Sequence, residues 1–480
     1  MFFDGIAYAD LPESGASSQK QNAIGAVIRF LEGKLGVTVL YDRRKYAYGR
    51  ADMAEILLLA EEMTNRGILS GFSPIPGLSD EPPFKFWAAN FSDVPGHVAG
   101  GMSVSSDIEA LTSALAEAME RYIRYEEKDY FSGALRSTVK NIASRGPYIP
   151  PERFAAFSDT ERKKRDDRVL RADAEYLWIR GTSLVSGKST YVPAQTVSAI
   201  PNIRRWSAPQ EPIIRESNTI GLATWPTRTG ARLAGALEIL EREAYMVMWL
   251  NQLTLPRISL RSLKENSPRL REMIERCEKY RLRPHVVKLL TDAPTHAACV
   301  ILEDASGVPP RFALGLSAHR SLTHAVEKAL LEALRARTYL RLKPDGSDWI
   351  PGAPLEKIGH HDRLHYWAHP SNAPKLEFLI QGKEEVPKDA SWEKDTIEEH
   401  LERIVSWCVS KSFECVSVLL ISTKNPTPWQ IEMIIMPDLQ PTYLSEASQQ
   451  TGGSRWRDIP TAFGITARNV PFLEEPHPFC

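Results

Sequence analysis

The sequence predicts an α/β or α+β fold in which related helix–strand units surround one site. Strand-like segments alternate with helical ones over much of the 480 residues, for example at Tyr176 to Ile179, His285 to Leu290 and Cys415 to Ile421. In addition, three helical segments share one residue pattern, and each follows a stretch of small residues. Three units at irregular separations are too few for a solenoid, so we expect them to pack around a common site.

The first 84 residues differ in style from the rest. Their candidate elements are two helices and a short strand, at Gln21 to Leu35, Ala51 to Ile68 and Gly36 to Tyr41. The stretch from Gly71 to Pro83 is rich in Gly, Pro and Ser, which is typical of a linker. We therefore predict an N-terminal region at residues 1–84, which could dock a partner, and a main domain at residues 85–480.

Two later segments are predicted to be loops or turns. Tyr148 to Arg168 is polar and strongly charged, and mixed charge runs are ordinarily exposed to solvent. Gly181 to Thr190 resembles a phosphate-binding P-loop, but five residues rather than four separate Gly181 from the Gly-Lys pair. A strand-like Thr190 to Pro193 follows where a helix should start, so we interpret this segment as a turn between strands.

Composition excludes several classes of protein. The chain carries 59 Lys and Arg against 60 Asp and Glu, which removes the basic field of a dedicated nucleic-acid or membrane-surface binder. No apolar run approaches the ~18 residues that cross a bilayer, and the first residues lack the features of a signal peptide. The 5 cysteines are scattered and never spaced as C-x-x-C. We expect a cytoplasmic protein with reduced thiols.

The shared helical pattern carries paired glutamates. The three segments are Ser113 to Arg121, Ala234 to Arg242 and Lys328 to Arg337, preceded by Gly100 to Ser103, Gly221 to Ala223 and Gly315 to Ser317. Residues three apart lie on one helix face, so Glu117 pairs with Glu120, and Glu238 with Glu241. Such pairs repel on an alanine- and leucine-rich face, so something positive must offset them. The arginines that follow could do so, as could Mg²⁺, which takes hard oxygen ligands and commonly brings phosphate oxygens.

Together these segments resemble the YcaO family of ATP-dependent enzymes that modify peptide backbones. The resemblance rests on the S-x-x-x-E-x-x-E-R string at Ser113 to Arg121 and the second E-x-x-E-R string at Glu238 to Arg242. Further matching pieces are Trp178 to Pro193, Leu314 to Arg337, His361 to Leu379 and Ile434 to Pro441. The resemblance runs from about residue 85 to the C-terminus, and it implies a YcaO-type fold with a nucleotide site that has no P-loop.

The resemblance also implies which residues form that site. In the family, carboxylates from these helices hold Mg²⁺ against the phosphates of ATP. By position, the metal ligands would be Glu117, Glu120, Glu238 and Glu241. The residues that contact the nucleotide would be Ser113, Arg121, Asn218, Arg242 and Arg337. Arginine suits this role because its guanidinium is planar, permanently charged and matched to phosphate oxygens.

The C-terminus resembles that of one branch of the family. Members that form azolines from Cys, Ser or Thr residues usually end in P-x-P-x-P, and this chain ends in E-P-H-P-F-C. In those enzymes the stiff, extended tail is thought to reach the active site. The resemblance therefore adds Cys480, His477 and Pro478 as candidate catalytic residues, with the Cys480 carboxylate or the His477 side chain as the base.

Two departures from the family pattern stand out. After Gly221 to Ala223 the family often has G-N-T-x-x-E-A, but Pro226 and Gly230 cannot supply the Asn and Glu side chains. The glycine-rich stretch at Gly100 also lacks the lysine of the family's G-K-G. These departures leave open an ATPase that is weakened or depends on a partner.

The resemblance implies an Mg²⁺- and ATP-dependent cyclodehydratase that acts on a ribosomally made precursor peptide. A Cys, Ser or Thr side chain would attack the preceding carbonyl, and ATP would phosphorylate the resulting oxyanion, so that phosphate leaves and a thiazoline or oxazoline forms. Two alternatives stay open: thioamide or amidine formation by the same activation, and a scaffold that binds leader peptide and partners. The implied partners are an E1-like or leader-binding protein, in some systems a flavin dehydrogenase, and a second copy of the chain.

Overall fold

The computed structural model describes residues 52–91, 98–123, 131, 133–154, 156–171, 173–197, 211–344, 350–387, 390–420 and 425–479. The predicted elements Gln21 to Leu35 and Gly36 to Tyr41 lie outside these ranges, as does Cys480. The described part combines helices with three sheets, so the prediction of a mixed α/β fold is confirmed. None of its helices is long and apolar enough to cross a membrane.

The first sheet has three antiparallel strands, β1 (Leu69–Pro74), β2 (Lys85–Phe91) and β3 (Val98–Ser103). Helix α3 (Met53–Asn65), which begins with a capping box at Asp52, contacts β1, and α4 (Asp107–Tyr122) packs on β3 and β2. The predicted linker therefore contains most of a strand, and the expected boundary at residue 84 falls between two paired strands. The residues of β1 are typical of turns, so the sequence did not indicate a strand there. The strand forms through its pairing with β2, which is a tertiary contact.

The second sheet has the order β4–β5–β13–β14–β7, with β6 paired to β5. Its strands are β4 (Leu135–Thr138), β5 (Glu175–Ser183), β6 (Ser189–Pro193), β7 (Leu222–Trp225), β13 (Val416–Leu420) and β14 (Gln430–Ile435). Strands β5 and β6 form an antiparallel hairpin, so the segment that resembles a P-loop is a turn between strands, as predicted. Helix α8 (Arg228–Asn251) contacts β14 and β7, and α13 (Ile397–Lys411) contacts α8.

The third sheet has the order β11–β10–β9–β8–β12. Its strands are β8 (Arg257–Ile258), β9 (Leu282–Lys288), β10 (His296–Asp304), β11 (Phe312–His319) and β12 (Glu384–Glu385). Helix α11 (Leu322–Leu342) packs on β11 and β10. The remaining α-helices are α6 (Val139–Ala143), α7 (Asp159–Lys163), α9 (Leu260–Asn266), α10 (Pro268–Lys279), α12 (His360–Ala368) and α14 (Arg455–Ala462).

The segment from Tyr148 to Arg168 is less exposed than predicted. Ile149 and Phe154 belong to the hydrophobic core, and the Arg168 side chain is 2% exposed. Arg168 donates a hydrogen bond to the carbonyl oxygen of Ala447, at 3.0 Å. Apolar residues and contacts with distant backbone groups thus anchor a segment whose charges alone suggested a solvated loop.

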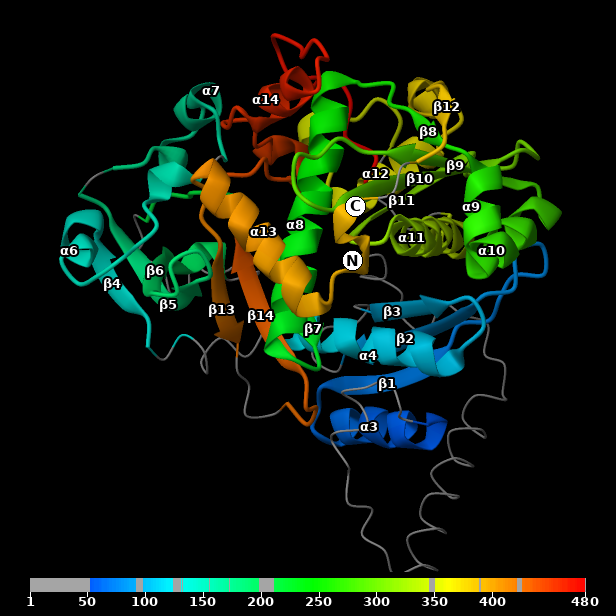
Figure 1. Cartoon of the computed structure of the whole chain (residues 1–480), viewed down its shortest axis with the longest axis horizontal. Coiled ribbons are helices and arrows are strands. Elements are labelled where there is room, and N and C mark those ends of the chain that lie inside the picture. Colours follow the sequence, from blue (N-terminus) through cyan, green and yellow to red (C-terminus); the bar gives the residue numbers. More distant parts are fainter. Residues whose placement is uncertain are drawn as a thin grey trace, which may run out of the picture.

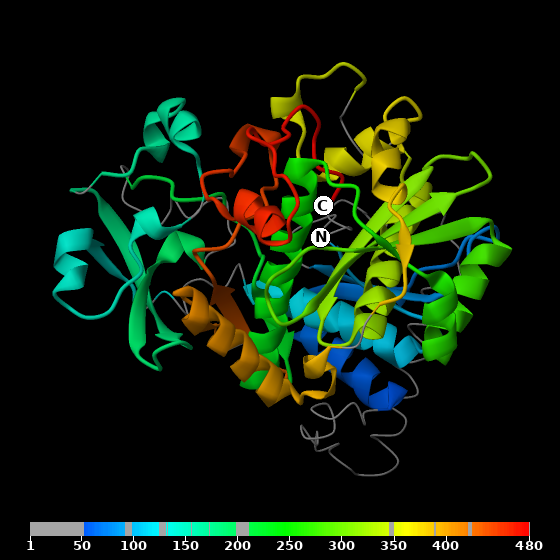
Figure 2. The same cartoon turned by 45° about the horizontal axis from the view of Figure 1, so that its top comes forward.

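Figure 1 shows how these parts surround α8. The helix runs between the sheet that contains β13 and β14 and the sheet that contains β9 to β11, while α4 and the first sheet lie beneath it. Figure 2 shows the C-terminal segment with α14 against one end of α8, in agreement with the contacts between these two helices. The three helices of the shared pattern, α4, α8 and α11, therefore come together near the middle of the molecule.

Candidate active site

Glycines bring each patterned helix close to the strand before it. A Cβ atom on Gly101 would lie 2.0 Å from a carbonyl oxygen of α4, and one on Gly315 would lie 2.0 Å from a carbonyl oxygen of α11. In the middle unit, a Cβ on Gly235 of α8 would lie 2.5 Å from the carbonyl oxygen of Gly221. The small-residue stretches seen in the sequence are thus the places where strand and helix backbones meet.

The first glutamate of each helix accepts a hydrogen bond from its own unit. The three bonds run from Gly100 N to Glu117 Oε2 (3.1 Å), from Gly221 N to Glu238 Oε2 (2.9 Å) and from Leu316 N to Glu332 Oε2 (2.7 Å). Glu332 was not among the predicted ligands. The signal for it was present in the sequence, because Glu332 occupies the position of Glu117 and Glu238 in the third copy of the pattern.

The residue three positions later links each unit to the next. Glu120 Oε1 accepts a hydrogen bond from Thr224 N of β7 (2.7 Å), and Glu241 Oε2 accepts one from Ala318 N of β11 (3.1 Å). In the third helix this position is Arg335, whose Nη1 donates to the carbonyl oxygen of Gly100 in β3 (2.9 Å). The three units therefore form a closed cycle. Arginine replaces glutamate at one link, and the backbone group bound there changes from N–H to C=O.

These units enclose a cavity of about 470 Å³. The predicted site residues that line it are Ser113, Glu117, Glu120, Arg121, Glu238, Arg242 and His477. Helix α11 adds three charged residues that were not predicted, namely Lys328, Glu332 and Arg335. The cavity thus collects carboxylates and cations from all three helices of the shared pattern.

Two of the predicted glutamates, Glu120 in the cavity lining and Glu241 beside Arg242, have raised pKa values. Burial raises the pKa of Glu120 to about 8, and the nearby carboxylates of Glu238 and Glu117 act in the same direction. Burial also raises the pKa of Glu241 to about 8, with Glu332 and Glu238 adding to the effect. A bound cation would favour the ionised form of these groups, so their raised pKa values indicate a place for positive charge.

The arginines of the cavity are paired with its carboxylates. Arg121 Nη2 lies 2.7 Å from Glu117 Oε1, and Arg335 Nη1 lies 3.3 Å from Glu117 Oε2. Arg242 lies 2.8 Å from Glu241 and 3.6 Å from Glu238. Each guanidinium thus sits beside a carboxylate, where it could bind a phosphate oxygen if a metal ion took over part of the carboxylate charge.

The donor set fits Mg²⁺ that shares its coordination with a phosphate. Among the described residues, no group of three or more His, Cys, Asp or Glu side chains is arranged to hold a metal ion by itself. Instead each helix offers one or two carboxylates, and each first glutamate already uses one oxygen for a strand amide. Mg²⁺ is usually bound through one or two carboxylates and completed by phosphates and water, which agrees with this arrangement.

Arg337 and two other predicted residues lie away from the cavity lining. The Arg337 side chain is 3% exposed and donates hydrogen bonds to Glu81 (2.9 Å), Asp304 (2.7 Å) and the carbonyl oxygen of Pro310 (3.0 Å). These acceptors occupy its guanidinium, so we leave Arg337 out of the site. Glu241 is not in the cavity lining, but it pairs at 2.8 Å with Arg242, which lines the cavity. Asn218 is buried outside the lining, and its Oδ1 accepts a hydrogen bond from Ile220 N (3.1 Å).

The C-terminal tail reaches the cavity. His477 and Phe479 line it, and Arg242 stacks on the Phe479 ring at 4.2 Å. Pro478, the residue between them, is buried. Burial, aided by the charge of Arg363, holds the pKa of His477 well below its usual range. Its Nε2 donates to the carbonyl oxygen of Tyr443 (2.8 Å), so this neutral imidazole anchors the tail and is a weak proton acceptor.

At Pro226 and Gly230, where this chain departs from the family pattern, an aromatic ring lies at the cavity. Trp225 lines the cavity and is 42% exposed. A Cβ atom on Gly230 would lie 1.8 Å from the Trp225 ring, so any side chain at position 230 would displace the indole. The sequence thus exchanges two polar side chains of the family pattern for one indole.

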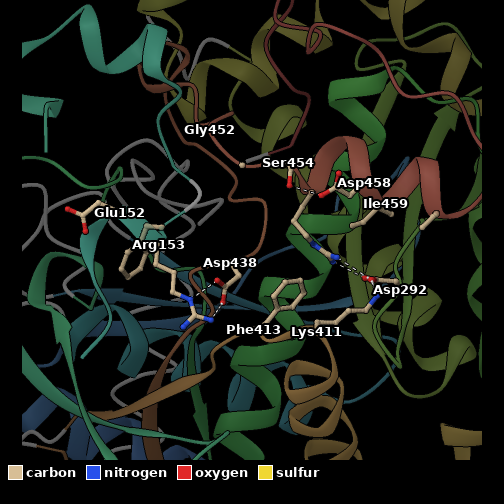
Figure 3. A pocket seen from close by; sticks show the side chains of 14 residues that line it. Glu152, Arg153, Asp292, Lys411, Phe413, Asp438, Gly452, Ser454, Asp458 and Ile459 are labelled. Atoms are coloured by element: carbon tan, nitrogen blue, oxygen red, sulfur yellow. Dashed lines mark hydrogen bonds and ion pairs between the residues drawn. The ribbon is translucent and has the colours of Figure 1, made fainter. Parts of the chain in front are cut away.

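A second cavity, of about 520 Å³, lies near α14 and the end of α13 (Figure 3). Three ion pairs lie in its lining: Arg153 with Asp438 (2.7 Å), Arg455 with Asp292 (2.8 Å) and Lys411 with Asp292 (2.9 Å). Its acid–base pairs compensate each other, and none of the predicted site residues lines it. We therefore assign the chemistry to the cavity between α4, α8 and α11.

The comparison with known families agrees with this geometry. The family model described as YcaO cyclodehydratase, ATP- and Mg²⁺-binding, matches residues 103–440. The chain belongs to the YcaO family. The predicted family and the predicted YcaO-type fold are therefore confirmed, and the family description agrees with the predicted ATP and Mg²⁺. A search of curated protein sequences found no match.

Several solved structures share the fold. A heterocyclase in complex with substrate and cofactor superposes with a TM-score of 0.68 at 18% identity, over 88% of this chain and 57% of that one. A YcaO from Methanopyrus kandleri bound with AMPPCP and Mg²⁺ gives 0.57 at 16% identity, over 80% and 90%. The E. coli microcin synthetase McbBCD complex with pro-MccB17 bound gives 0.53 at 14% identity, over 77% and 88%. The present chain thus spans little more than half of the first of these.

Proposed function

We propose that this YcaO protein is an ATP- and Mg²⁺-dependent cyclodehydratase that converts Cys, Ser or Thr residues of a ribosomally made precursor peptide to thiazolines or oxazolines. The observation that carries the proposal is that carboxylates from three repeated units line one cavity. The solved heterocyclase with the same fold supports the reaction class, and the proline-containing tail at the cavity supports the azoline-forming branch.

The proposed roles of the charged residues follow from their positions. Glu117, Glu120, Glu238 and Glu332 would hold Mg²⁺, and Glu241 would support them through its ion pair with Arg242. Bound Mg²⁺ would supply charge compensation for the carboxylates and the phosphate oxygens of ATP. Arg121 and Arg242 would bind phosphate oxygens, Ser113 would donate a hydrogen bond to one of them, and Asn218 would fix the loop that precedes β7.

The reaction balances with ATP as the only co-substrate. The thiol or hydroxyl of the peptide adds to the preceding amide carbon, and the resulting oxygen takes the γ-phosphoryl group, which leaves ADP. Loss of phosphate then forms the C=N bond of the ring. Phosphorylation is needed because the amide oxygen is a very poor leaving group. The residues of the chain contribute positioning and charge stabilisation.

Cys480 is the proposed source of the base. It directly follows Phe479 in the sequence, and Phe479 lines the cavity. His477 would hold the tail in position through Tyr443, and Pro478 would stiffen it. This assignment leaves proton transfer to the carboxylate because the depressed pKa of His477 makes the imidazole a weak acceptor.

The proposal includes partners and a setting. The fold is shared with a synthetase complex that carries a bound peptide precursor, which supports a separate leader-binding protein for this chain. A flavin dehydrogenase that oxidises the ring, a second copy of the chain, and docking through residues 1–84 are further parts of the proposal. The product would be a peptide natural product such as an antibiotic, made in the cytoplasm.

Intact-mass analysis of a precursor peptide after incubation with the chain, its partner and MgATP tests the proposal. Each azoline removes the mass of one water, whereas exchange of oxygen for sulfur would add mass. Glu238→Gln should slow the mass change and ADP release together by roughly 10²-fold or more, because it removes a carboxylate from the transition-state charge balance. Unaltered turnover in this variant would contradict the assignment of the site.

A further inference from the structure

Lys328 is a cation of the active-site cavity that has no partner among the described residues. The three arginines that line the cavity, Arg121, Arg242 and Arg335, each lie within 3.3 Å of a carboxylate oxygen. Lys328 also lines the cavity, but within the described ranges its ammonium makes no ion pair or hydrogen bond. The side chain of Lys328 is exposed at the cavity, so its ammonium is free to make a charge-assisted hydrogen bond to an anionic ligand there.

Lys328 occupies the same position in the repeated pattern as Ser113, and both residues line the cavity. Both residues, together with Ala234, lie four positions before the first glutamate of their helices, and all three line the cavity. Residues four apart share a helix face, so each sits one turn from its glutamate. The repeat therefore offers three equivalent positions around the ligand: a hydroxyl, a methyl group and an ammonium.

The charges around Lys328 place it on the α4 side of the cavity. Desolvation lowers its pKa, as do the cations Arg269 and Arg335, whereas the negative charges of Glu109 in α4 and of Glu327 act in the opposite direction. Glu109 lies one helical turn before Ser113. The carboxylate of Glu109 accepts hydrogen bonds from the Ser103 hydroxyl (2.5 Å) and from Arg269 (3.1 Å). It makes no hydrogen bond with the Lys328 ammonium, which remains available to a ligand.

We propose that Lys328 binds the terminal phosphate of the nucleotide, beside the Ser113 hydroxyl. The inference rests on the proposed function, because it takes the cavity to be the ATP site. A compact ammonium on a flexible stem is suited to phosphate oxygens, and the short side chain of Ala234 leaves space on the α8 side. Lys328 thereby gives the site a phosphate contact that no carboxylate of the cavity competes for at hydrogen-bond distance.

Equilibrium binding to the full chain tests this inference. MgATP, MgADP and inorganic tripolyphosphate with Mg²⁺ are titrated into the wild type, Lys328→Met and Lys328→Arg. We expect Lys328→Met to bind MgATP and tripolyphosphate roughly 10- to 100-fold more weakly, as for loss of a hydrogen bond between charged groups. MgADP should lose much less, and Lys328→Arg should retain most of the affinity. Lys357→Met, which removes an exposed lysine outside the cavity, is the matched control and should bind as the wild type.

If Lys328→Met binds MgATP as tightly as the wild type, the inference is overturned and the proposed function stands. If MgADP and MgATP lose affinity equally, the assignment to the terminal phosphate is wrong. If the wild type binds neither MgATP nor tripolyphosphate, the proposed function fails and the inference with it. Lys328→Gln, checked by thermal unfolding, replaces the methionine variant if that variant does not fold, and the same outcomes apply.

Discussion

Arg335 Nη1 donates a hydrogen bond to the carbonyl oxygen of Gly100 at 2.9 Å, and this bond closes the cycle of three strand–helix units. The other two links are made by Glu120 and Glu241, which accept from backbone N–H groups of the next unit. A cycle of this kind fixes all three helices relative to one another. It also explains why the carboxylates of distant segments converge on one cavity.

Breaking that closing link should loosen the cavity. Arg335→Met removes the partner of the Gly100 carbonyl and one cation beside Glu117, and leaving buried polar groups unpaired costs about 2–4 kcal/mol in the free energy of unfolding. Arg335→Lys should recover part of this loss. Urea unfolding of the two variants measures the difference. Equal stability of Arg335→Met and wild type would contradict the role of the link.

The stability of the metal-free protein should depend on pH. Glu120 and Glu241 have folded pKa values raised from 4.5 to about 8, so the folded state holds more protons than the unfolded state between these values. Their contribution to stability is present below about pH 4.5 and is lost as the pH rises through about 8. We expect the melting temperature to fall over this range, and Glu120→Gln to flatten the profile.

Binding of MgATP should release protons for the same reason. With pKa values of about 8, Glu120 and Glu241 are mostly protonated near pH 7. A bound cation favours their ionised form and so displaces these protons. Titration calorimetry in two buffers of different ionisation enthalpy measures the number released. In Glu120→Gln this number should fall. Identical heats in both buffers for the wild type would contradict the interpretation of the raised pKa values.

Arg337 should affect stability and not nucleotide binding. Its guanidinium is enclosed by Glu81, Asp304 and the carbonyl oxygen of Pro310, and removing one partner of a buried charge network typically costs about 3–5 kcal/mol. Arg337→Met should unfold at a lower urea concentration, and its folded fraction should bind MgATP with the affinity of the wild type. Weaker MgATP binding by well-folded Arg337→Lys would return this residue to the site.

The tail is held by a buried ion pair that can be tested separately. The side chains of Arg363 and Glu446 are fully buried 2.7 Å apart, and Arg363 Nη1 also donates to the carbonyl oxygens of Tyr443 (3.1 Å) and Phe479 (3.5 Å). Arg363→Met combined with Glu446→Leu removes the charges together, which avoids an unpaired buried carboxylate. We expect MgATP affinity to remain and kcat to fall roughly 10-fold or more, because the tail loses its anchor. An unchanged kcat would contradict a catalytic tail.

The sequence predicted the part of the site that local patterns encode. The pairs Glu117–Glu120 and Glu238–Glu241 follow from helical spacing, and the glycines before each helix follow from the need for close backbone approach. Glu332 was visible as the third copy of the same position, but the pattern there continues with Arg335 where the other helices have glutamate. A repeat in which one copy has arginine in place of glutamate is harder to recognise than an exact repeat.

Other features depended on contacts between distant segments. Strand β1 exists because it pairs with β2, and its glycine, serine and proline residues gave the appearance of a linker. Arg337 and Arg335 lie two residues apart on one helix, so they point to different sides of it. Only the positions of Glu81 and Asp304 determine that Arg337 belongs to a structural ion pair and Arg335 to the cavity.

The central claim is that carboxylates of separate helices hold Mg²⁺ with ATP in one cavity. The most direct measurement is the affinity for ATP with and without Mg²⁺, in the wild type, in the double variant Glu238→Gln/Glu332→Gln, and in the exposed control Glu398→Gln. We predict that Mg²⁺ strengthens ATP binding by the wild type and the control, and that the double variant loses roughly 10²-fold or more of this gain. The same Mg²⁺-dependent affinity in all three proteins would contradict the account.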